Sequence, residues 1–365
     1  MRTGPHPLPI HIGMATSAWP VMSQEEGLKL GEEMASGMEK MLRGIRKYQE
    51  HPYKPEQPEL PVVWEKGTVQ VRKCDADGAD KALVIVPSLV NRSSILDLSK
   101  ERSFTRWLAQ QGITVYLLDW GDVSKDSEQN DIDALALQRL VPALQAVADM
   151  EEGPVAALGY CMGGTMLMSA ATHAPGAIER MVMLAVPWDF HAGQQDLLNR
   201  IKFWAPSTTS YIEAGMPLPV EAIQTLFASL DPAMAARKFA SFDDMDQNSD
   251  TARLFIAVED WLNDGVSLPA QVAKHCIEQW FFTNEPGQGQ WVVGGKTIDP
   301  TSIHAPTLVV TSKKDRLVEY EQAACLADQM PHGKILNPEC GHIGMIAGAR
   351  SIEAVWQPIA DFLKT

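Results

Sequence analysis

Continuous apolar runs in the middle of the chain predict buried β-strands, and the stretches between them predict helices. In those stretches, apolar positions recur three and four residues apart. The expected strands are residues 82–90, 113–120, 154–160 and 180–188, and the expected helices are residues 99–112, 131–150 and about ten residues after 160. Strands that are apolar throughout are typical of a parallel sheet covered by helices on both faces. We therefore expect an α/β fold with a mostly parallel, doubly wound sheet.

The alternation of strands and helices stops after residue 188 and returns near residue 303. Residues 189–290 contain helix-like segments and many prolines but no clear strand run, which indicates an inserted, mainly helical cap. The later pattern consists of a strand within 303–315, a helix over 319–330, a strand over 333–342 and a closing helix over 351–364. We predict a core formed by residues 62–188 and 291–365, which the cap interrupts.

The N-terminal part of the chain has a different pattern. Residues 24–49 predict one amphipathic helix with an apolar stripe at helical spacing, made of Leu30, Met34, Met38, Met41 and Ile45. We favour packing of this stripe on the protein's own domain over contact with a partner or a lipid-like surface. Residues 51–61 contain four prolines and read as an extended linker. Residues 1–61 thus precede the core, which begins with the strand-like stretch 62–74.

Composition narrows the range of partners. The chain has 365 residues, of which 45% are hydrophobic, so it can form one large α/β domain with an insertion or two smaller domains. Its net charge of −15 would repel polyanions, which argues against binding to nucleic acid or to anionic lipid. An anionic substrate would therefore need a local basic lining.

The number and spacing of the cysteines and the absence of long apolar runs bear on metal binding and on the cellular location of the protein. The five cysteines are odd in number and lack CxxC spacing, so they fit neither a disulfide framework nor a zinc site. We expect no metal and no bound cofactor. The sequence shows neither a signal-peptide pattern nor about 18 consecutive apolar residues, which predicts a cytoplasmic protein without a transmembrane segment.

A candidate nucleophile lies directly after the apolar run 154–160. The stretch GYCMGGT has the form of the nucleophile elbow of the α/β-hydrolase fold, with Cys161 where many such enzymes have serine. Gly159 and Gly163 supply the small residues that this tight strand-to-helix turn needs. The N-terminus of the following helix would favour a thiolate. We interpret the other four cysteines as structural.

The partners of this cysteine follow from chain order. In the α/β-hydrolase fold the acid follows the penultimate strand and the base follows the last one. Asp315 and His342 occupy those places, and we interpret the other histidines as structural or exposed. The backbone amide of Met162 is expected to form one half of the oxyanion hole. The other half should come from residues 88–92, and Val90 is our choice.

The segments around these residues resemble the polyhydroxyalkanoate synthases, which polymerise 3-hydroxyacyl groups from coenzyme A thioesters. They span roughly residues 60–345, and they are VVWEKGTVQV (62–71), PSLVNRSSILDL (87–98), SFTRWLAQQGITVYLLDWGD (103–122), GYCMGGT (159–165), VEDWLNDG (258–265), VVGGKTIDPTSIHAPTLVVTSKKDRLV (292–318) and GHIGM (341–345). The resemblance places the family's catalytic cysteine, aspartate and histidine on Cys161, Asp315 and His342. The chain departs from the family's pattern at three positions, Ser88, Arg92 and Glu319.

The resemblance implies an α/β-hydrolase-fold acyltransferase with 3-hydroxyacyl-CoA as substrate, probed most simply with 3-hydroxybutyryl-CoA because short acyl chains are expected. Coenzyme A would be part of the substrate, and its binding residues are not identified. The resemblance also implies a second synthase subunit, because the chain is about as short as the two-subunit types, together with a homodimer and a location at polyester granules. Two alternatives stay open. One is a cysteine-dependent hydrolase, either a depolymerase or an acyl-CoA thioesterase, and the other is an inactive paralogue that binds granules or a partner.

Overall fold

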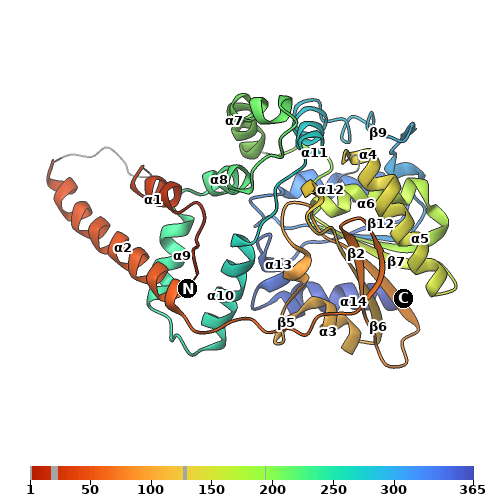
Figure 1. Ribbon diagram of the computed structural model, residues 1–365, viewed down its shortest axis with the longest axis horizontal. Helices are drawn as coiled ribbons and strands as arrows, with labels where there is room; N and C mark the ends of the chain where they lie inside the picture. The colour runs from red at the N-terminus through yellow and green to blue at the C-terminus, as the bar shows by residue number, and fades with distance from the viewer. Residues whose placement is uncertain (1, 18–23, 126–129, 194) are drawn as a thin grey trace.

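Most of the described strands form one twisted sheet at the centre of the molecule (Figure 1). The computed structural model describes residues 2–17, 24–125, 130–193 and 195–365, and for residues 15–17 and 24–34 it describes the backbone alone. The sheet has eight strands in the order β1-β2-β6-β3-β7-β8-β11-β12. They are β1 (Val62–Lys66), β2 (Val69–Cys74), β3 (Lys81–Val86), β6 (Ile113–Asp119), β7 (Val155–Tyr160), β8 (Ile178–Leu184), β11 (Thr307–Val310) and β12 (Gly333–Leu336).

The direction of the strands confirms the expected fold class. All neighbours from β6 to β12 pair in parallel, and only β2 runs in the opposite direction, antiparallel to both β1 and β6. Along β3, Leu83 and Ile85 face one apolar layer while Val84 and Val86 face the other. Both faces of the central strands are therefore buried under helices, as their continuous apolar sequence predicts.

Helices cover the two faces of the sheet as separate sets. One face carries α4 (Ile132–Ala134), the π-helix η3 (Leu135–Leu140), α5 (Val141–Met150), α6 (Met162–His173) and α12 (Tyr320–Gln329). The other face carries α3 (Phe104–Gln110), α13 (Gly344–Ala347), the π-helix η7 (Ile352–Trp356) and α14 (Gln357–Lys364). Short 3₁₀ turns lie at η1 (Ser93–Leu96), η2 (Val123–Lys125), η4 (Pro175–Ala177) and η6 (Pro300–Ser302).

Two predicted elements at the start of the core differ from the structure. The strand-like stretch 62–74 is a hairpin of β1 and β2, because Gly67 has a φ of +61° and reverses the chain. The helix expected over 99–112 begins only at Phe104, because the side chain of Ser103 caps it by accepting a hydrogen bond from the amide of Arg106. The residues before that cap form the strand pair β4 (Asp97–Ser99) and β5 (Arg102–Ser103).

The chain between β8 and β11 is mostly helical. Its elements are α7 (Asp196–Glu213), α8 (Val220–Leu230), α9 (Met234–Asp243), α10 (Asp250–Asn263), α11 (Ala270–His275), the π-helix η5 (Cys276–Phe282) and the small hairpin of β9 (Val292–Val293) and β10 (Lys296–Thr297). Figure 1 shows α11 above the sheet, α7 and α8 higher up on the side toward the N-terminal helices, and α9 and α10 beside the sheet. We refer to this helical region as the cap; its predicted boundaries stay a prediction.

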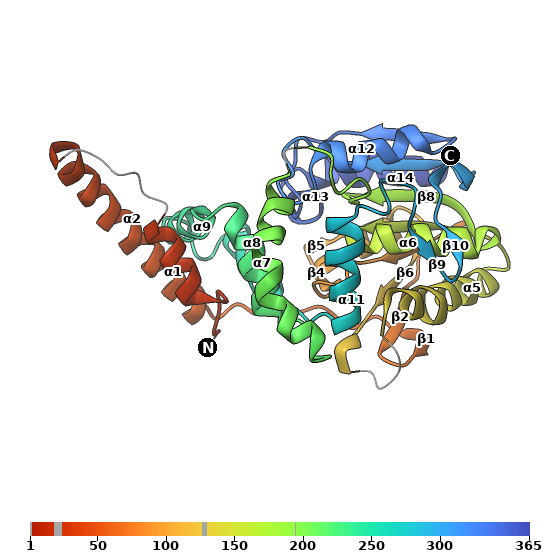
Figure 2. The ribbon, with the colours of Figure 1, turned by 90° about the horizontal axis from the view of Figure 1, so that it is seen from above.

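The predicted N-terminal helix is present as α2 (Gln24–Glu50), preceded by α1 (Leu8–Ser17). Figures 1 and 2 show these two helices at the end of the molecule farthest from the sheet. In the C-terminal half of α2, Met41 and Ile45 are buried against Phe239 and Phe242 of α9. This half of the methionine stripe thus packs on the protein's own cap. The side chains of two other stripe residues, Leu30 and Met34, lie outside the described residues.

One glycine fixes how closely α2 approaches α9. A Cβ atom added at Gly44 would lie 1.9 Å from the carbonyl oxygen of Phe239, whereas one added at Gly37 would meet nothing within 4 Å. The helix backbones therefore touch at Gly44, and a backbone carbonyl cannot turn aside as a flexible side chain can. Residues 51–61, which carry neither helix nor strand, then lead from α2 to the sheet.

Gly44→Ala should separate α2 from the cap. We expect it to lower the free energy of unfolding by about 1–3 kcal/mol through overpacking. The matched variant Gly37→Ala, on the same helix but in open space, should raise it by up to about 1 kcal/mol, because alanine favours helix more than glycine does. Urea denaturation followed by circular dichroism measures both. Equal effects of the two substitutions would show that the close contact at Gly44 is absent in solution.

Candidate active site

Cys161 lies in a strained turn between β7 and α6. Its φ of +52° and ψ of −130° are unusual for a residue with a side chain. The turn is tight because glycines surround it. A Cβ atom on Gly159 would lie 2.2 Å from the Cα atom of Gly164, and one on Gly163 would lie 2.3 Å from the carbonyl oxygen of Pro87. The local sequence thus forces the cysteine to the tip of the turn, at the N-terminus of α6.

Asp315 and His342 form a hydrogen-bonded pair. The Nδ1 atom of His342 lies 2.7 Å from Oδ2 of Asp315, and the aspartate side chain is only 1% exposed. The other carboxylate oxygen, Oδ1, accepts hydrogen bonds from the backbone amides of Leu317 at 2.8 Å and Val318 at 3.0 Å. Both oxygens of Asp315 are therefore held, and the carboxylate fixes the orientation of the imidazole.

The surroundings of His342 favour its charged form. Burial lowers the pKa of the imidazole, but the negative charge of Asp315 and several smaller contributions, the last of them the hydrogen bond to Asp315, together outweigh burial, and the pKa lies well above its usual value. The ring of Tyr160 stacks on His342 with centroids 5.3 Å apart, and burial raises the pKa of this tyrosine to about 12. The stacked tyrosine is therefore neutral at physiological pH.

The three predicted catalytic residues meet at one cleft. Cys161 and His342 both line this cleft, which has a volume of about 480 Å³, and Asp315 lies behind His342. The walls of the cleft come from the loop after β3, from α8 to α10 of the cap and from the loops after β11 and β12. Segments that lie far apart in the sequence thus place a thiol and an imidazole on one surface.

Four basic side chains lie on the cleft wall, where an anionic substrate would need them, but each is paired with a carboxylate. The pairs are Arg92 with Asp264 at 3.2 Å, Lys238 with Glu259 at 2.7 Å, Lys314 with Glu339 at 3.1 Å and Arg316 with Asp231 at 2.7 Å. Lys314 and Arg316 are more than half exposed, so water weakens their ion pairs. An anionic ligand could therefore exchange places with these carboxylates at small cost.

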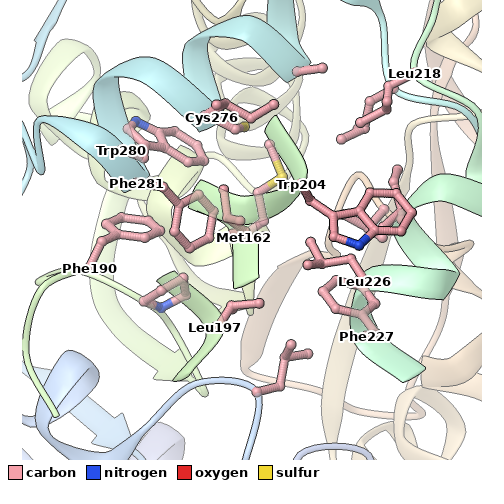
Figure 3. Close-up of a pocket in the computed structure, with 18 of the residues that line it drawn as sticks. Met162, Phe190, Leu197, Trp204, Leu218, Leu226, Phe227, Cys276, Trp280 and Phe281 are labelled. Atoms are coloured by element: carbon pink, nitrogen blue, oxygen red, sulfur yellow. The ribbon is translucent and has the colours of Figure 1, made fainter. Parts of the chain in front are cut away.

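A second, smaller cavity opens from the same cysteine into the cap (Figure 3). This cap cavity has a volume of about 150 Å³. Cys161 and Met162 line it together with residues of α7, α8, α11 and η5, of which Figure 3 labels Leu197, Trp204, Leu226, Phe227, Cys276, Trp280 and Phe281. Four residues line both spaces: Val90, Cys161, Phe227 and Leu317. The thiol therefore lies where an ion-lined cleft meets an apolar cavity.

The two predicted oxyanion donors differ in their present bonding. The amide of Met162 lies in the first turn of α6, where backbone N–H groups have no acceptor within their own helix. The amide of Val90 donates to Oγ of Ser88 at 3.2 Å. Val90 also lines both spaces beside Cys161. Because its amide is bonded to Ser88, it would have to exchange this partner for the oxyanion in order to act as an oxyanion-hole donor. Both assignments stay predictions.

The loop that carries Val90 is tied to the cap by contacts that the sequence did not reveal. The indole Nε1 of Trp261 donates to the carbonyl oxygen of Arg92 at 2.8 Å, and Asn91 forms a β-bridge with Gly265. The two segments are the NRSS and DWLNDG parts of the resemblance. Both were recognisable in the sequence, but nothing in their spacing showed that they touch.

The described part of the chain contains neither a cluster of potential metal ligands nor a helix that could span a membrane. Within residues 2–17, 24–125, 130–193 and 195–365, no group of three or more His, Cys, Asp or Glu side chains is placed to hold a metal ion. No helix in those ranges is long and apolar enough to cross a bilayer.

Comparison with known families and structures identifies the fold. The family profile of the α/β hydrolase fold matches residues 81–349. MenH from Staphylococcus aureus superimposes with a TM-score of 0.52 at 14% identity, covering 80% of this chain and 97% of its own. A thermophilic esterase from Thermogutta terrifontis gives a TM-score of 0.50 at 13% identity, covering 85% and 98%. These likenesses concern the fold alone.

Curated relatives confirm the resemblance found in the sequence. Poly(3-hydroxyalkanoate) polymerase subunit PhaC of Haloferax mediterranei is 27% identical, over 78% of this chain and 58% of the relative. The subunit of Haloarcula marismortui is 25% identical over 82% and 66%, and that of Allochromatium vinosum is 26% identical over 84% and 88%. The chain thus spans less than two thirds of the first two relatives. It belongs to the α/β-hydrolase fold family, and within that family it is similar to the poly(3-hydroxyalkanoate) polymerases.

Proposed function

We propose that this chain is a polyhydroxyalkanoate synthase that transfers 3-hydroxyacyl groups from coenzyme A to a growing polyester through a cysteine thioester. The observation that carries the proposal is the position of Cys161 at the elbow, on the same cleft as a half-buried imidazole that Asp315 orients at 2.7 Å. The similarity to poly(3-hydroxyalkanoate) polymerases supports this substrate class over other acyl groups.

The first half-reaction would load the acyl group. His342, whose Nδ1 is engaged by Asp315, presents Nε2 to the thiol and takes its proton. The thiolate attacks the thioester carbonyl carbon, and the amides of Met162 and Val90 would bind the oxyanion. A new carbon–sulfur bond to Cys161 replaces the one to coenzyme A, which leaves with the proton. Because one thioester replaces another, the step is nearly balanced in free energy.

The second half-reaction would lengthen the chain. The hydroxyl of an incoming 3-hydroxyacyl unit loses its proton to His342 and attacks the acyl carbon on Cys161. A carbon–oxygen ester bond forms while the carbon–sulfur bond breaks, and the proton returns to the sulfur. The high pKa of His342 favours its charged form once it has taken the proton of the thiol or of the hydroxyl within each step.

The two spaces around Cys161 suit a coenzyme A thioester. The cleft with its exchangeable ion pairs would receive the phosphates, and the apolar walls next to the thiol would limit the access of water to the acyl-enzyme. The curated relatives bear the word subunit in their names, which supports dependence on a second synthase subunit. A homodimer and a place at the granule surface belong to the same proposal.

The products formed from a 3-hydroxyacyl-CoA distinguish a synthase from a hydrolase and from an inactive paralogue. Incubation with 3-hydroxybutyryl-CoA or 3-hydroxyoctanoyl-CoA, with and without a candidate second subunit, should release coenzyme A and yield polyester. Cys161→Ala should reduce the release to background, and Cys161→Ser should reduce it on the order of 10³-fold or more, since a serine alkoxide forms far less readily. Free hydroxyacid as the product would indicate a hydrolase, and no release would indicate an inactive paralogue.

His342→Gln should leave the thiol in place but without its base. We expect iodoacetamide to alkylate Cys161 at least about tenfold more slowly at pH 7, because fewer molecules carry a thiolate. Mass spectrometry of the peptide containing Cys161 gives the rate. His173→Gln, on the helix that Cys161 begins, is a control and should alkylate like the wild type. An unchanged rate in His342→Gln would exclude His342 as the proton acceptor.

Asp315→Asn should change the titration of His342. The carboxylate stabilises the imidazolium, so its loss leaves burial to dominate and lowers the pKa of His342. NMR titration of the Cε1 proton of His342 measures the midpoint directly. Asp328→Asn removes a charge of the same sign from α12 and should leave the midpoint in place. A midpoint that stays put in Asp315→Asn would contradict the assigned pair.

A further inference from the structure

The cap cavity has the chemistry of a hydrocarbon site. None of the described residues that line it carries a charge. The hydroxyl of Thr208 donates to the carbonyl oxygen of Ala205 within α7, and Oε1 of Gln322 accepts from the amide of Glu319. The hydroxyl of Thr208 and Oε1 of Gln322 are therefore already bonded to the backbone, whereas the buried indole Nε1 of Trp280, which also lines the cavity, has no hydrogen-bond partner. A ligand that enters gains mainly by burying apolar surface.

The position of the cavity selects which part of a substrate enters it. Cys161 lines both spaces, and His342 lines only the cleft. An acyl group on the sulfur can point its hydroxyl toward the imidazole in the cleft while its alkyl tail enters the cap cavity, which residues of α7 and α8 line. The opposite orientation would bury the hydroxyl among side chains that are almost all apolar, away from the imidazole in the cleft.

The size of the cavity sets the length of that tail. Its volume is about 150 Å³. An apolar cavity of that volume holds one benzene molecule, which corresponds to about six carbon atoms. We propose that the cap cavity is an acyl-chain site that makes this chain selective for medium-length 3-hydroxyacyl groups, from 3-hydroxyhexanoyl to 3-hydroxyoctanoyl, over 3-hydroxybutyryl. The inference rests on the proposed function and departs from the short chains that the resemblance implied.

Burial of each methylene gives the expected selectivity. A butyryl group leaves most of the cavity unfilled, and each further methylene that enters it should raise kcat/KM about fourfold. The gain should end when the cavity is full, so that 3-hydroxydodecanoyl-CoA reacts no faster than the octanoyl substrate. The profile of kcat/KM against chain length should thus rise from four carbons and level off or fall beyond eight.

Trp204 is the side chain that we assign to limit the length of the cavity. It is half-buried on α7, and Figure 3 shows its indole ring among Leu218, Leu226 and Phe227. Its neighbour Phe203 is 84% exposed and points to solvent, which makes it a matched control on the same helix. Ala222 of α8 also lines the cavity and leaves room for a larger side chain to enter it.

The experiment compares kcat/KM for coenzyme A release from 3-hydroxyacyl-CoA substrates of 4, 6, 8 and 12 carbons. The wild type should prefer six to eight carbons by about tenfold or more over four. Trp204→Ala should raise the value for twelve carbons relative to eight, Ala222→Leu should abolish the advantage of eight over four, and Phe203→Ala should match the wild type. A wild type that prefers four carbons, or cavity variants that share the wild-type profile, would overturn the inference.

A second readout separates the inference from the proposed function. If no substrate releases coenzyme A, the synthase proposal fails, and the rate at which alkyl methanethiosulfonates modify Cys161 then decides the cavity. The hexyl reagent should modify the wild type faster than the methyl reagent, and Ala222→Leu should remove that advantage while Phe203→Ala keeps it. Equal rates of the two reagents in the wild type would show that the cavity does not take up an alkyl chain.

Discussion

The arrangement of the site depends on the steric constraint at the turn between β7 and α6. A Cβ atom on Gly159 or Gly163 would collide with backbone, and one on Gly164 would collide with the side chain of Val186, and this closeness holds Cys161 at a φ of +52°. The strand and the helix on either side are buried, so the turn cannot relax by moving one of them. Because the thiol stands at the tip, it can reach two spaces at once. A wider turn would withdraw it from both.

The second ordering element is the carboxylate of Asp315. Two backbone amides of the loop after β11 hold one of its oxygens, and the other binds His342. The charge of this buried group offsets the burial of the imidazole, which explains why His342 favours its protonated form in a largely apolar setting. The loop conformation, the aspartate and the histidine thus act as one unit, although they come from different strands.

The cap lines both spaces that meet at Cys161, the apolar cavity and the cleft. Its helices α7 and α8 form the wall of the apolar cavity, while α10 contacts the loop after β3 through Trp261 and Arg92. The N-terminal helix α2 packs on α9 and not on the sheet. The N-terminal helix and the loop after β3 therefore both contact the cap. The position of the cap determines the shape of both spaces beside Cys161.

The sequence alone predicted the sheet class, the helix α2 and the placement of Cys161, Asp315 and His342, because hydrophobic period, glycine spacing and strand order are local or topological properties. It misjudged the hairpin at 62–74 and the start of α3, where the single residues Gly67 and Ser103 override the apolar pattern. Three features depended on tertiary structure: the bond that occupies the amide of Val90, the pairing of the cleft cations and the lining of the cap cavity. The cation pairs and the cavity lining join segments distant in sequence, and the bond from Val90 to Ser88 depends on how the loop after β3 folds. Amphipathicity shows that a helix has an apolar face, but only packing decides whether that face fills a core or borders a cavity.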